Sequence, residues 1–256
     1  MSQSQRTDKW FQAFGAPHGR GPRLLCLPHA GGSSSFYRPL AIPIGDAAEV
    51  FAVQYPGRQE RRFEPPLTDL RELARLIHAE LGPWNDRPLV LFGHSMGAVI
   101  AYEIARRLEN DGAPPLGLIV SGRRAPSIAG GENVHQRGDQ AILAELRHLS
   151  GTAAALLDDE GVVQMILPSL RADYRAIETY RHRPGTEPTC PITVLTGDAD
   201  PRAPLAEVRA WSRHTTGAFD LRTFPGGHFY LTAQWPAVAT AVREAVGEFT
   251  TPVSLG

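Results

Sequence analysis

The stretch LVLFGHSMGAVIAYEIARR, residues 89–107, changes abruptly from one pattern to another. It opens with four apolar residues, Leu89–Phe92, and continues with apolar side chains at helical spacing, among them Met96, Ile100 and Ile104. Between the two patterns stands GHSMG, which fits the G-x-S-x-G pattern of a nucleophile elbow. The stretch therefore predicts a strand, a sharp turn that carries a serine, and a helix.

The two glycines of this motif have a steric purpose. A turn this sharp forces Ser95 into a strained backbone conformation, and Gly93 and Gly97 remove side chains that would collide with neighbouring elements. The Ser95 hydroxyl would then stand clear of the sheet at a helix N-terminus, where N–H groups favour developing negative charge. The alternative is a glycine-rich turn with a helix-capping serine. The position between a strand and a helix favours the nucleophile.

Strand and helix patterns alternate along most of the chain. Short apolar runs, typical of strands covered on both faces, occur at Arg23–Pro28, Val50–Tyr55, Leu89–Phe92, Gly117–Ser121, Ile192–Thr196 and Asp220–Phe224. Helical patterns occur at Asp69–Leu81, Met96–Asn110, Leu205–His214 and Ala237–Phe249. This alternation predicts an α/β fold with a mostly parallel central sheet and helices on both faces.

The alternation is interrupted at residues 123–184, where no strand pattern is found. Amphipathic helical patterns occur instead at 141–149 and 167–180. One face of the second pattern is formed by Leu167, Leu170, Tyr174 and Ile177. Insertions of such length are usually lids or binding elements. The alternative is a plain packed helix with Arg171 and Asp173 facing solvent.

A serine hydroxyl needs a base, and in this fold class the chain order is serine, acid, histidine. The stretch TGDAD offers Asp198 and Asp200. The pattern G-x-x-D from Gly197 favours Asp200, whereas Asp198 would serve the turn. His228 follows two glycines in PGGHFYL and is the candidate base. The candidate catalytic residues are therefore Ser95, Asp200 and His228.

The other histidines give no competing signal. His94 lies beside the serine, and its side chain is expected to point away from the hydroxyl. A solvated surface is expected for His18, His78, His135, His148, His182 and His214. No histidine has metal-ligand spacing with another histidine or a cysteine, so no metal site is expected.

An oxyanion hole needs two N–H groups. One is expected from Met96, the residue after the serine, and the other from Ala30 in the loop LPHAGGSSSF, which follows an early strand. The two glycines of this loop let its backbone bend toward a substrate, and His29 is expected to fix the loop by hydrogen bonding. This interpretation depends on Ser95 being a nucleophile, because the same stretch could otherwise be an ordinary flexible turn.

Composition excludes several classes of protein. The chain has 256 residues, 42% of them hydrophobic, and a net charge of −1, with no basic tail that would indicate a nucleic-acid partner. No run of 18 apolar residues predicts a membrane span, and the N-terminal stretch lacks the apolar region of a secretory signal. Cys26 and Cys190 stand far apart, which indicates a reducing compartment and no disulfide framework. We expect one cytoplasmic α/β domain over residues 1–256.

Seven stretches together resemble the type II thioesterases of polyketide and nonribosomal-peptide biosynthesis. They are LPHAGGSSSFY (27–37), VQYPGRQERR (53–62), FGHSMGA (92–98), SGRRAP (121–126), LPSLRADY (167–174), TGDAD (196–200) and PGGHFYL (225–231). The resemblance runs from about residue 10 to residue 250. SGRRAP and LPSLRADY are its more specific parts, because general acyl hydrolysis gives no reason for them.

The resemblance implies an α/β-hydrolase fold with a helical lid at about 123–184. It implies a stand-alone editing enzyme that hydrolyses acyl groups from the 4′-phosphopantetheine arm of acyl or peptidyl carrier proteins. The reaction would pass through an acyl-serine and use no cofactor. In the family's pattern Ser95, Asp200 and His228 match the triad, and Ala30 and Met96 match the oxyanion donors.

Other interpretations remain open at the level of sequence. A small-molecule esterase or lipase would use the same triad. A macrocyclising thioesterase normally ends a giant synthase, whereas this chain begins with its own methionine. A non-catalytic binding protein on a hydrolase scaffold is the alternative from a different class.

Two groups of arginines are candidates for docking an acidic carrier protein. They are Arg58, Arg61 and Arg62 in one group, and Arg123 and Arg124 in the other. Either group could instead form a solvated face or internal ion pairs.

Overall fold

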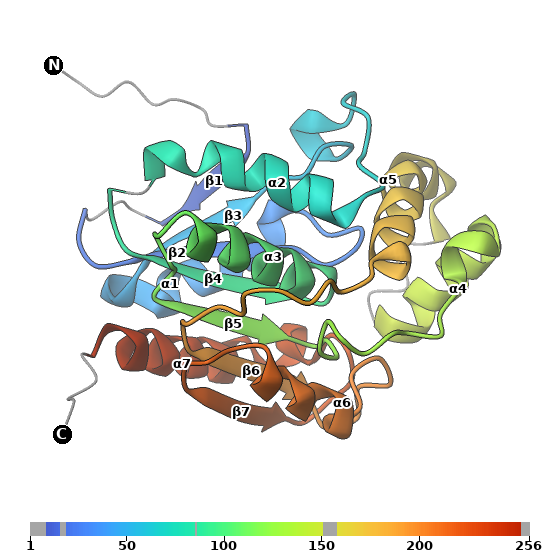
Figure 1. The fold of residues 1–256 in the computed structure, drawn as a ribbon. Coiled ribbons are helices and arrows are strands. Elements are labelled where there is room, and N and C mark those ends of the chain that lie inside the picture. Colours follow the sequence, from blue (N-terminus) through green and yellow to red (C-terminus); the bar gives the residue numbers. More distant parts are fainter. Residues whose placement is uncertain (1–8, 16–18, 85, 151–157, 252–256) are drawn as a thin grey trace, which may run out of the picture.

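The computed structural model describes residues 9–15, 19–84, 86–150 and 158–251. A seven-stranded sheet runs through the molecule in the order β1-β3-β2-β4-β5-β6-β7 (Figure 1). The strands are β1 (Phe11–Phe14), β2 (Arg23–Leu27), β3 (Glu49–Val53), β4 (Leu89–His94), β5 (Gly117–Ser121), β6 (Ile192–Gly197) and β7 (Phe219–Phe224). Strands β2 to β7 pair in parallel, and β1 pairs antiparallel with β3 at one edge. This mostly parallel sheet confirms the predicted α/β architecture.

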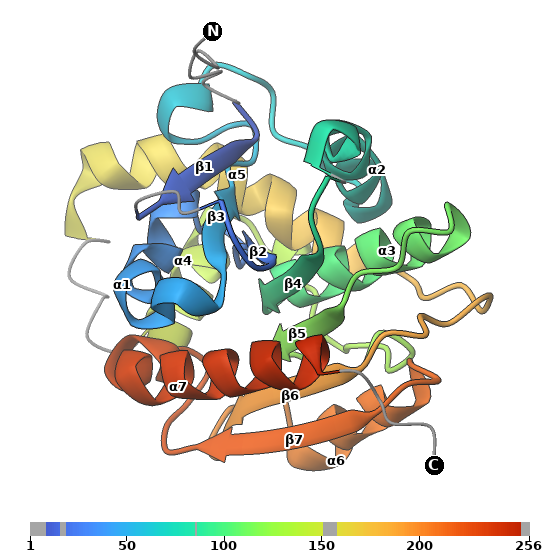
Figure 2. The ribbon, with the colours of Figure 1, turned by 90° about the vertical axis from the view of Figure 1, so that its left-hand side faces the viewer.

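Helices cover both faces of the sheet, as Figure 2 shows. The α-helices are α1 (Ala41–Ile44), α2 (Leu70–Glu80), α3 (Met96–Asn110), α4 (Asp139–Ser150), α5 (Glu160–Thr179), α6 (Leu205–Arg209) and α7 (Tyr230–Thr250). Helices α2 and α3 pack into one apolar core, and α1 and α7 into a second. Along β4, Leu89 and Leu91 enter the first core, whereas Val90 and Phe92 enter the second. Because both faces of β4 are covered, its sequence is continuously apolar.

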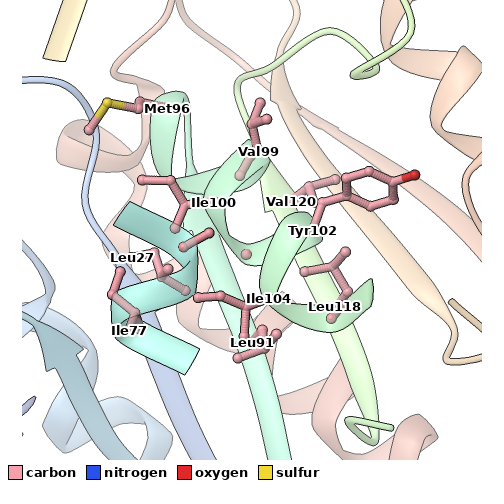
Figure 3. Packing of buried hydrophobic residues seen from close by; sticks show 14 of the residues in the cluster. Leu27, Ile77, Leu91, Met96, Val99, Ile100, Tyr102, Ile104, Leu118 and Val120 are labelled. Atoms are coloured by element: carbon pink, nitrogen blue, oxygen red, sulfur yellow. The ribbon is translucent and has the colours of Figure 1, made fainter. Parts of the chain in front are cut away.

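Helix α3 packs on the sheet through the apolar side chains that recur at helical spacing (Figure 3). Met96, Ile100 and Ile104 are each buried. They share one core with Leu27 of β2 and Leu91 of β4. The observed helix therefore confirms the strand, turn and helix that were predicted for residues 89–107.

Element boundaries differ from expectation where the local pattern is short or interrupted. Strand β1 has only four residues, too few to show a period. Helix α7 begins at Tyr230, earlier than the predicted start at Ala237. The backbone of Gln234 leaves helical geometry just before Pro236, so the helix is kinked there. Because of that kink, the residues before Pro236 do not continue the helical pattern that begins at Ala237, and the sequence pattern did not predict the first turns of the helix.

The segment between β5 and β6 is helical in its described part, as predicted. It contains α4 and α5 and no strand. Helix α5 begins before the amphipathic pattern at 167–180, because the Asp159 side chain caps it by accepting from the N–H groups of Gly161 and Val162. The predicted apolar face is buried, and it consists of Leu167, Leu170, Tyr174 and Ile177.

In the part of the chain that the structure describes, no helix combines the length and the apolar character that crossing a membrane requires.

The close packing of α3 on β2 predicts the effect of a single methyl group. A Cβ at Gly97 would lie 2.0 Å from the carbonyl oxygen of Leu27, a backbone atom that cannot move aside. We expect Gly97→Ala to destabilise the fold by about 3 kcal/mol, which for a chain of this size lowers the melting temperature by roughly 6–12 °C. Thermal unfolding followed by circular dichroism measures this.

The matched control is Gly247→Ala. Gly247 lies on the exposed side of α7, and a Cβ there would have no neighbour within 4 Å. Because alanine has a higher helix propensity than glycine, this variant should gain about 1 kcal/mol. Equal melting temperatures for the two variants would contradict the packing argument.

Candidate active site

Ser95 occupies the turn between β4 and α3 with a strained backbone. Its φ is 55° and its ψ is −114°, a conformation that non-glycine residues rarely adopt. Its N–H donates to the carbonyl of Ser121 on the neighbouring strand, at 2.8 Å. Its side chain makes no capping hydrogen bond to α3, although it stands at the capping position. The alternative of a helix-capping serine is therefore wrong.

Three predicted site residues come together in one chain of contacts. The Nε2 atom of His228 lies 3.0 Å from the Oγ of Ser95, and its Nδ1 atom lies 2.9 Å from an oxygen of Asp200. His228 and Asp200 are both buried. When Nδ1–H donates to Asp200, Nε2 is left as an acceptor for the serine proton. The arrangement can therefore activate Ser95 as a nucleophile.

The structure also separates the two candidate acids. Asp200 contacts His228, and its other oxygen accepts from the N–H of Arg202 at 2.8 Å. Asp198 instead accepts from the N–H of Gly226 at 2.9 Å, which ties the loop after β6 to the loop after β7. Asp198 thus does not contact His228, and its contact is with a second loop, not within its own turn as had been expected.

All of these residues lie at one edge of the sheet. Ser95 follows β4, Asp200 follows β6 and His228 follows β7, so each stands beyond the carboxyl end of a parallel strand (Figure 1). Ala30 follows β2 at the same edge. In open parallel sheets this edge is where ligands bind.

Two histidines lie beside the site and make different contacts, His94 being buried and His29 partly buried. His94 contacts the Ser121 hydroxyl through Nδ1 at 2.9 Å and not Ser95, as expected. The expectation for His29 was wrong, because its buried Nδ1 has no hydrogen-bond partner among the described residues. Its ring instead packs edge-on against Phe36 and Phe229, with centroid distances of 4.6 and 4.8 Å. Ring packing therefore fixes this side chain.

Burial also sets the charge of these two histidines. Desolvation, reinforced by nearby His228 and Arg58, lowers the pKa of His29 to about 3. Desolvation, reinforced by His228 and His29, lowers the pKa of His94 well below its ordinary value. Both rings are therefore neutral at neutral pH.

Ala30 and Met96 line the same cavity as Ser95. Neither of their N–H groups donates a hydrogen bond to another residue in the described part of the chain. Met96 is the first residue of α3, where a backbone N–H has no partner within the helix. Both N–H groups are therefore available to a bound group.

The cavity beside Ser95 has a volume of about 380 Å³, within the range of small-molecule sites. On the side away from the sheet it is lined by apolar residues of α4 and α5, namely Leu146, Leu149, Tyr174 and Ile177. Arg123 also lines it, and desolvation lowers the pKa of this guanidinium to about 10. Arg123 therefore stays charged at neutral pH.

Most of the candidate docking arginines are internal. Arg58 forms a buried ion pair with Asp173, and Arg61 donates to Glu64 and to the carbonyl of Gln54. These contacts favour internal ion pairs over a docking surface. They also correct the alternative in which Asp173 faces solvent, since only 1% of that residue is exposed.

The remaining three arginines differ from one another. Arg124 is buried and pairs with Glu132 and Glu207. Arg62 is exposed and lies over the ring of the exposed Phe63. Arg123 faces the cavity, so no continuous basic surface is formed by the two groups.

Two histidines expected on a solvated surface meet at Tyr102, His214 being buried and His182 partly buried. The hydroxyl of Tyr102 lies 3.2 Å from His182 Nε2 and 3.2 Å from His214 Nδ1, and it donates to Glu187. The potential ligand atoms of His182, Glu187 and His214 lie within 4.8 Å of one another, an arrangement that their positions in the sequence do not indicate. The Tyr102 hydroxyl lies among them and satisfies them by hydrogen bonding.

The chain is similar to known thioesterases over most of its length. A family model described as a thioesterase domain matches residues 22–246. A probable cadicidin biosynthesis thioesterase of Streptomyces griseus is 50% identical over 93% of this chain, which spans 66% of that relative's length. Thioesterase PikA5 of Streptomyces venezuelae is 48% identical over 92% of this chain and 84% of its own. The solved structure of the type II thioesterase BorB, from the borrelidin biosynthetic cluster, is 49% identical with a TM-score of 0.87, covering 93% of this chain and 98% of that one.

The contact between His228 and Asp200 predicts how fast Ser95 reacts with a fluorophosphonate probe. Without the Asp200 carboxylate the imidazole loses the partner that fixes its tautomer, so Asp200→Asn should slow labelling by roughly 10³-fold or more. Asp198→Asn is the matched control and should be labelled at close to the wild-type rate. A reversed order would move the acid to Asp198, and labelling at another serine would remove Ser95.

Proposed function

Because this chain belongs to the thioesterase family, we propose that it is a stand-alone editing thioesterase. It hydrolyses acyl groups from the 4′-phosphopantetheine arm of acyl or peptidyl carrier proteins in polyketide or nonribosomal-peptide synthesis. The observation that carries the proposal is the contact chain from Ser95 through His228 to Asp200 at the wall of a 380 Å³ cavity. The names of the relatives, and the near-complete coverage of the BorB chain, support this class of substrate.

The first half of the reaction transfers the acyl group to the protein. His228 Nε2 accepts the hydroxyl proton as the Oγ of Ser95 attacks the thioester carbonyl carbon. The resulting oxyanion accepts hydrogen bonds from the N–H groups of Ala30 and Met96. The carbon–sulfur bond then breaks, and the proton on His228 passes to the departing pantetheine thiolate. An acyl-serine is left on Ser95.

The second half returns the enzyme to its starting state. A water molecule gives a proton to His228 and attacks the acyl-serine, and the same two N–H groups hold the oxyanion. The bond to Ser95 breaks as Oγ recovers the proton from His228, and a free acid leaves. Throughout, Asp200 holds the imidazole in one tautomer and stabilises its charged form. No step requires a cofactor.

Helices α4 and α5 have a role in this proposal as a lid over the acyl group. Their side chains form the apolar wall of the cavity opposite the sheet. Val134, Ile142, Leu170 and Tyr174 form a small separate core between them, and Ile177 near the end of α5 joins the large core of α2 and α3. A lid of this kind would exclude bulk water and admit the pantetheine arm at its edge.

A small-molecule esterase would use the same chain of contacts. Family membership favours a thioester over an oxygen ester. The contact of His228 with Ser95 argues against a non-catalytic scaffold, because a binding protein has no need of it.

Turnover of an acyl-loaded carrier protein tests the proposed reaction. Wild-type protein should release the free acid, and an acyl-serine should be detected as a mass increase on Ser95 in the intact protein. Ser95→Ala should remain folded and lose roughly 10⁴-fold or more in kcat. Ser212→Ala, which removes an exposed serine of the turn after α6, should leave turnover unchanged. Release of acid by Ser95→Ala at the wild-type rate would refute the mechanism.

Amide hydrogen exchange tests the lid. Because α4 and the part of α5 up to Tyr174 pack on the small core, their amides should exchange faster than those of β4 and α3. Stable acylation of Ser95 by a slowly hydrolysed inhibitor should slow exchange in α5 more than in the sheet. Protection of α4 and α5 equal to that of the sheet, with or without inhibitor, would argue against a moving lid.

A further inference from the structure

The loop that carries Ala30 is held by a residue from outside the sheet. Gly31, the next residue, donates its N–H to a carboxylate oxygen of Asp173 at 2.8 Å. Asp173 belongs to α5, 142 positions further along the chain. A lid helix therefore contacts the backbone directly beside the proposed oxyanion donor.

Arg58 completes this contact from a third segment. Its guanidinium donates to both oxygens of Asp173, at 2.8 and 2.9 Å, and also to the carbonyl oxygen of Gly32 at 2.9 Å. Arg58 and Asp173 are both buried. One planar fork and one carboxylate thus fix the N–H of Gly31 and the carbonyl of Gly32 together.

The loop is also in close steric contact with α5. Gly31 has a φ of +75°, and a Cβ there would lie 2.4 Å from the Cδ2 atom of Leu170 on α5. The α5 helix therefore covers Gly31 with an apolar side chain and binds its N–H with a charged one. Displacement of α5 would remove both contacts at once.

We propose that Asp173 and Arg58 are positioning residues that couple the position of α5 to the alignment of the oxyanion hole. The Ala30 N–H points at the reacting carbonyl only while Asp173 holds Gly31. Hydrolysis then proceeds when the lid is closed over the acyl group and stops when the lid is displaced. This inference rests on the proposed function, because it assigns a role to neighbours of the proposed oxyanion donor.

The coupling predicts a particular kinetic signature. Asp173 contacts the loop and not the acyl cavity, so its loss should leave substrate binding largely intact. A displacement of about 1 Å in a reacting geometry costs on the order of 100-fold in rate. We therefore expect Asp173→Asn to lower kcat by about 10- to 100-fold with little change in KM, on an acyl thioester of a small thiol.

The matched control lies on the same helix. Arg171→Gln breaks the ion pair between Arg171 and Asp139, which is exposed and distant in sequence from the loop. Because this pair does not contact the oxyanion loop, the control should keep the wild-type kcat. Equal losses in Arg171→Gln and Asp173→Asn would mean that any disturbance of α5 slows the enzyme, and would overturn the inference.

Inhibitor affinities separate positioning from a general structural role. A trifluoromethyl ketone forms a tetrahedral oxyanion on Ser95, whereas the corresponding amide binds without forming one. Asp173→Asn should weaken the ketone by the same factor as kcat and leave the affinity of the amide unchanged. A parallel loss for both ligands would show that the cavity itself is damaged, which contradicts the inference.

A double variant keeps the test valid if removal of one buried charge prevents folding. Replacing both partners, as Arg58→Met with Asp173→Leu, leaves no unpaired buried charge, and such apolar replacements are often neutral or stabilising. This variant should unfold near the wild-type temperature, yet its kcat should stay at least tenfold low, because Gly31 lacks an acceptor. Recovery of both stability and kcat would reduce the pair to a structural role.

The outcomes distinguish this inference from the proposed function. Wild-type protein that hydrolyses no thioester would refute the function, and the inference would fall with it. Wild-type turnover accompanied by equal turnover of Asp173→Asn would leave the function standing and refute the coupling alone.

Discussion

The backbone of Ser95 is the constraint on which the rest of the structure depends. Its positive φ reverses the chain between β4 and α3 within one residue and aims the side chain away from both. That reversal requires a glycine on either side, because a Cβ at Gly93 would lie 2.1 Å from the carbonyl of Gly97, and one at Gly97 would lie 2.0 Å from the carbonyl of Leu27. The strain is held by burial of α3 and by the hydrogen bond from Ser95 to the carbonyl of Ser121.

Around this turn, desolvation keeps two histidine side chains uncharged. The low pKa values of His29 and His94 keep two rings beside His228 neutral. Neither of them places a positive charge beside the residue that is proposed to accept the serine proton. The Asp200 carboxyl group contacts His228 Nδ1, as the proposed transfer of the serine proton requires.

The sequence predicted what is local and missed what is distant. Ser95 was identified because its two glycines and its flanking strand and helix lie within 19 residues, 89–107. Asp200 and His228 followed from the order of strands, since each loop after a parallel strand reaches the same edge. The ion pair between Arg58 and Asp173 joins positions 115 apart, and no periodicity connects them.

The same limit explains the errors in detail. His182 and His214 were expected on a solvated surface, yet both contact the buried Tyr102 hydroxyl. The SGRRAP and LPSLRADY stretches stood out by resemblance alone. The structure supplies a physical reason for part of each, in the cavity wall at Arg123 and in the contact of Asp173 with Gly31.

We propose that this protein removes acyl groups from carrier proteins. The most direct test compares kcat/KM for one short acyl group presented on a pantetheinylated carrier protein and on a small thiol such as N-acetylcysteamine. We expect a large preference for the carrier, because the protein surface and the full arm would both contribute to binding. Equal values for the two substrates would contradict the assignment of a carrier partner, while leaving the hydrolysis at Ser95 in place.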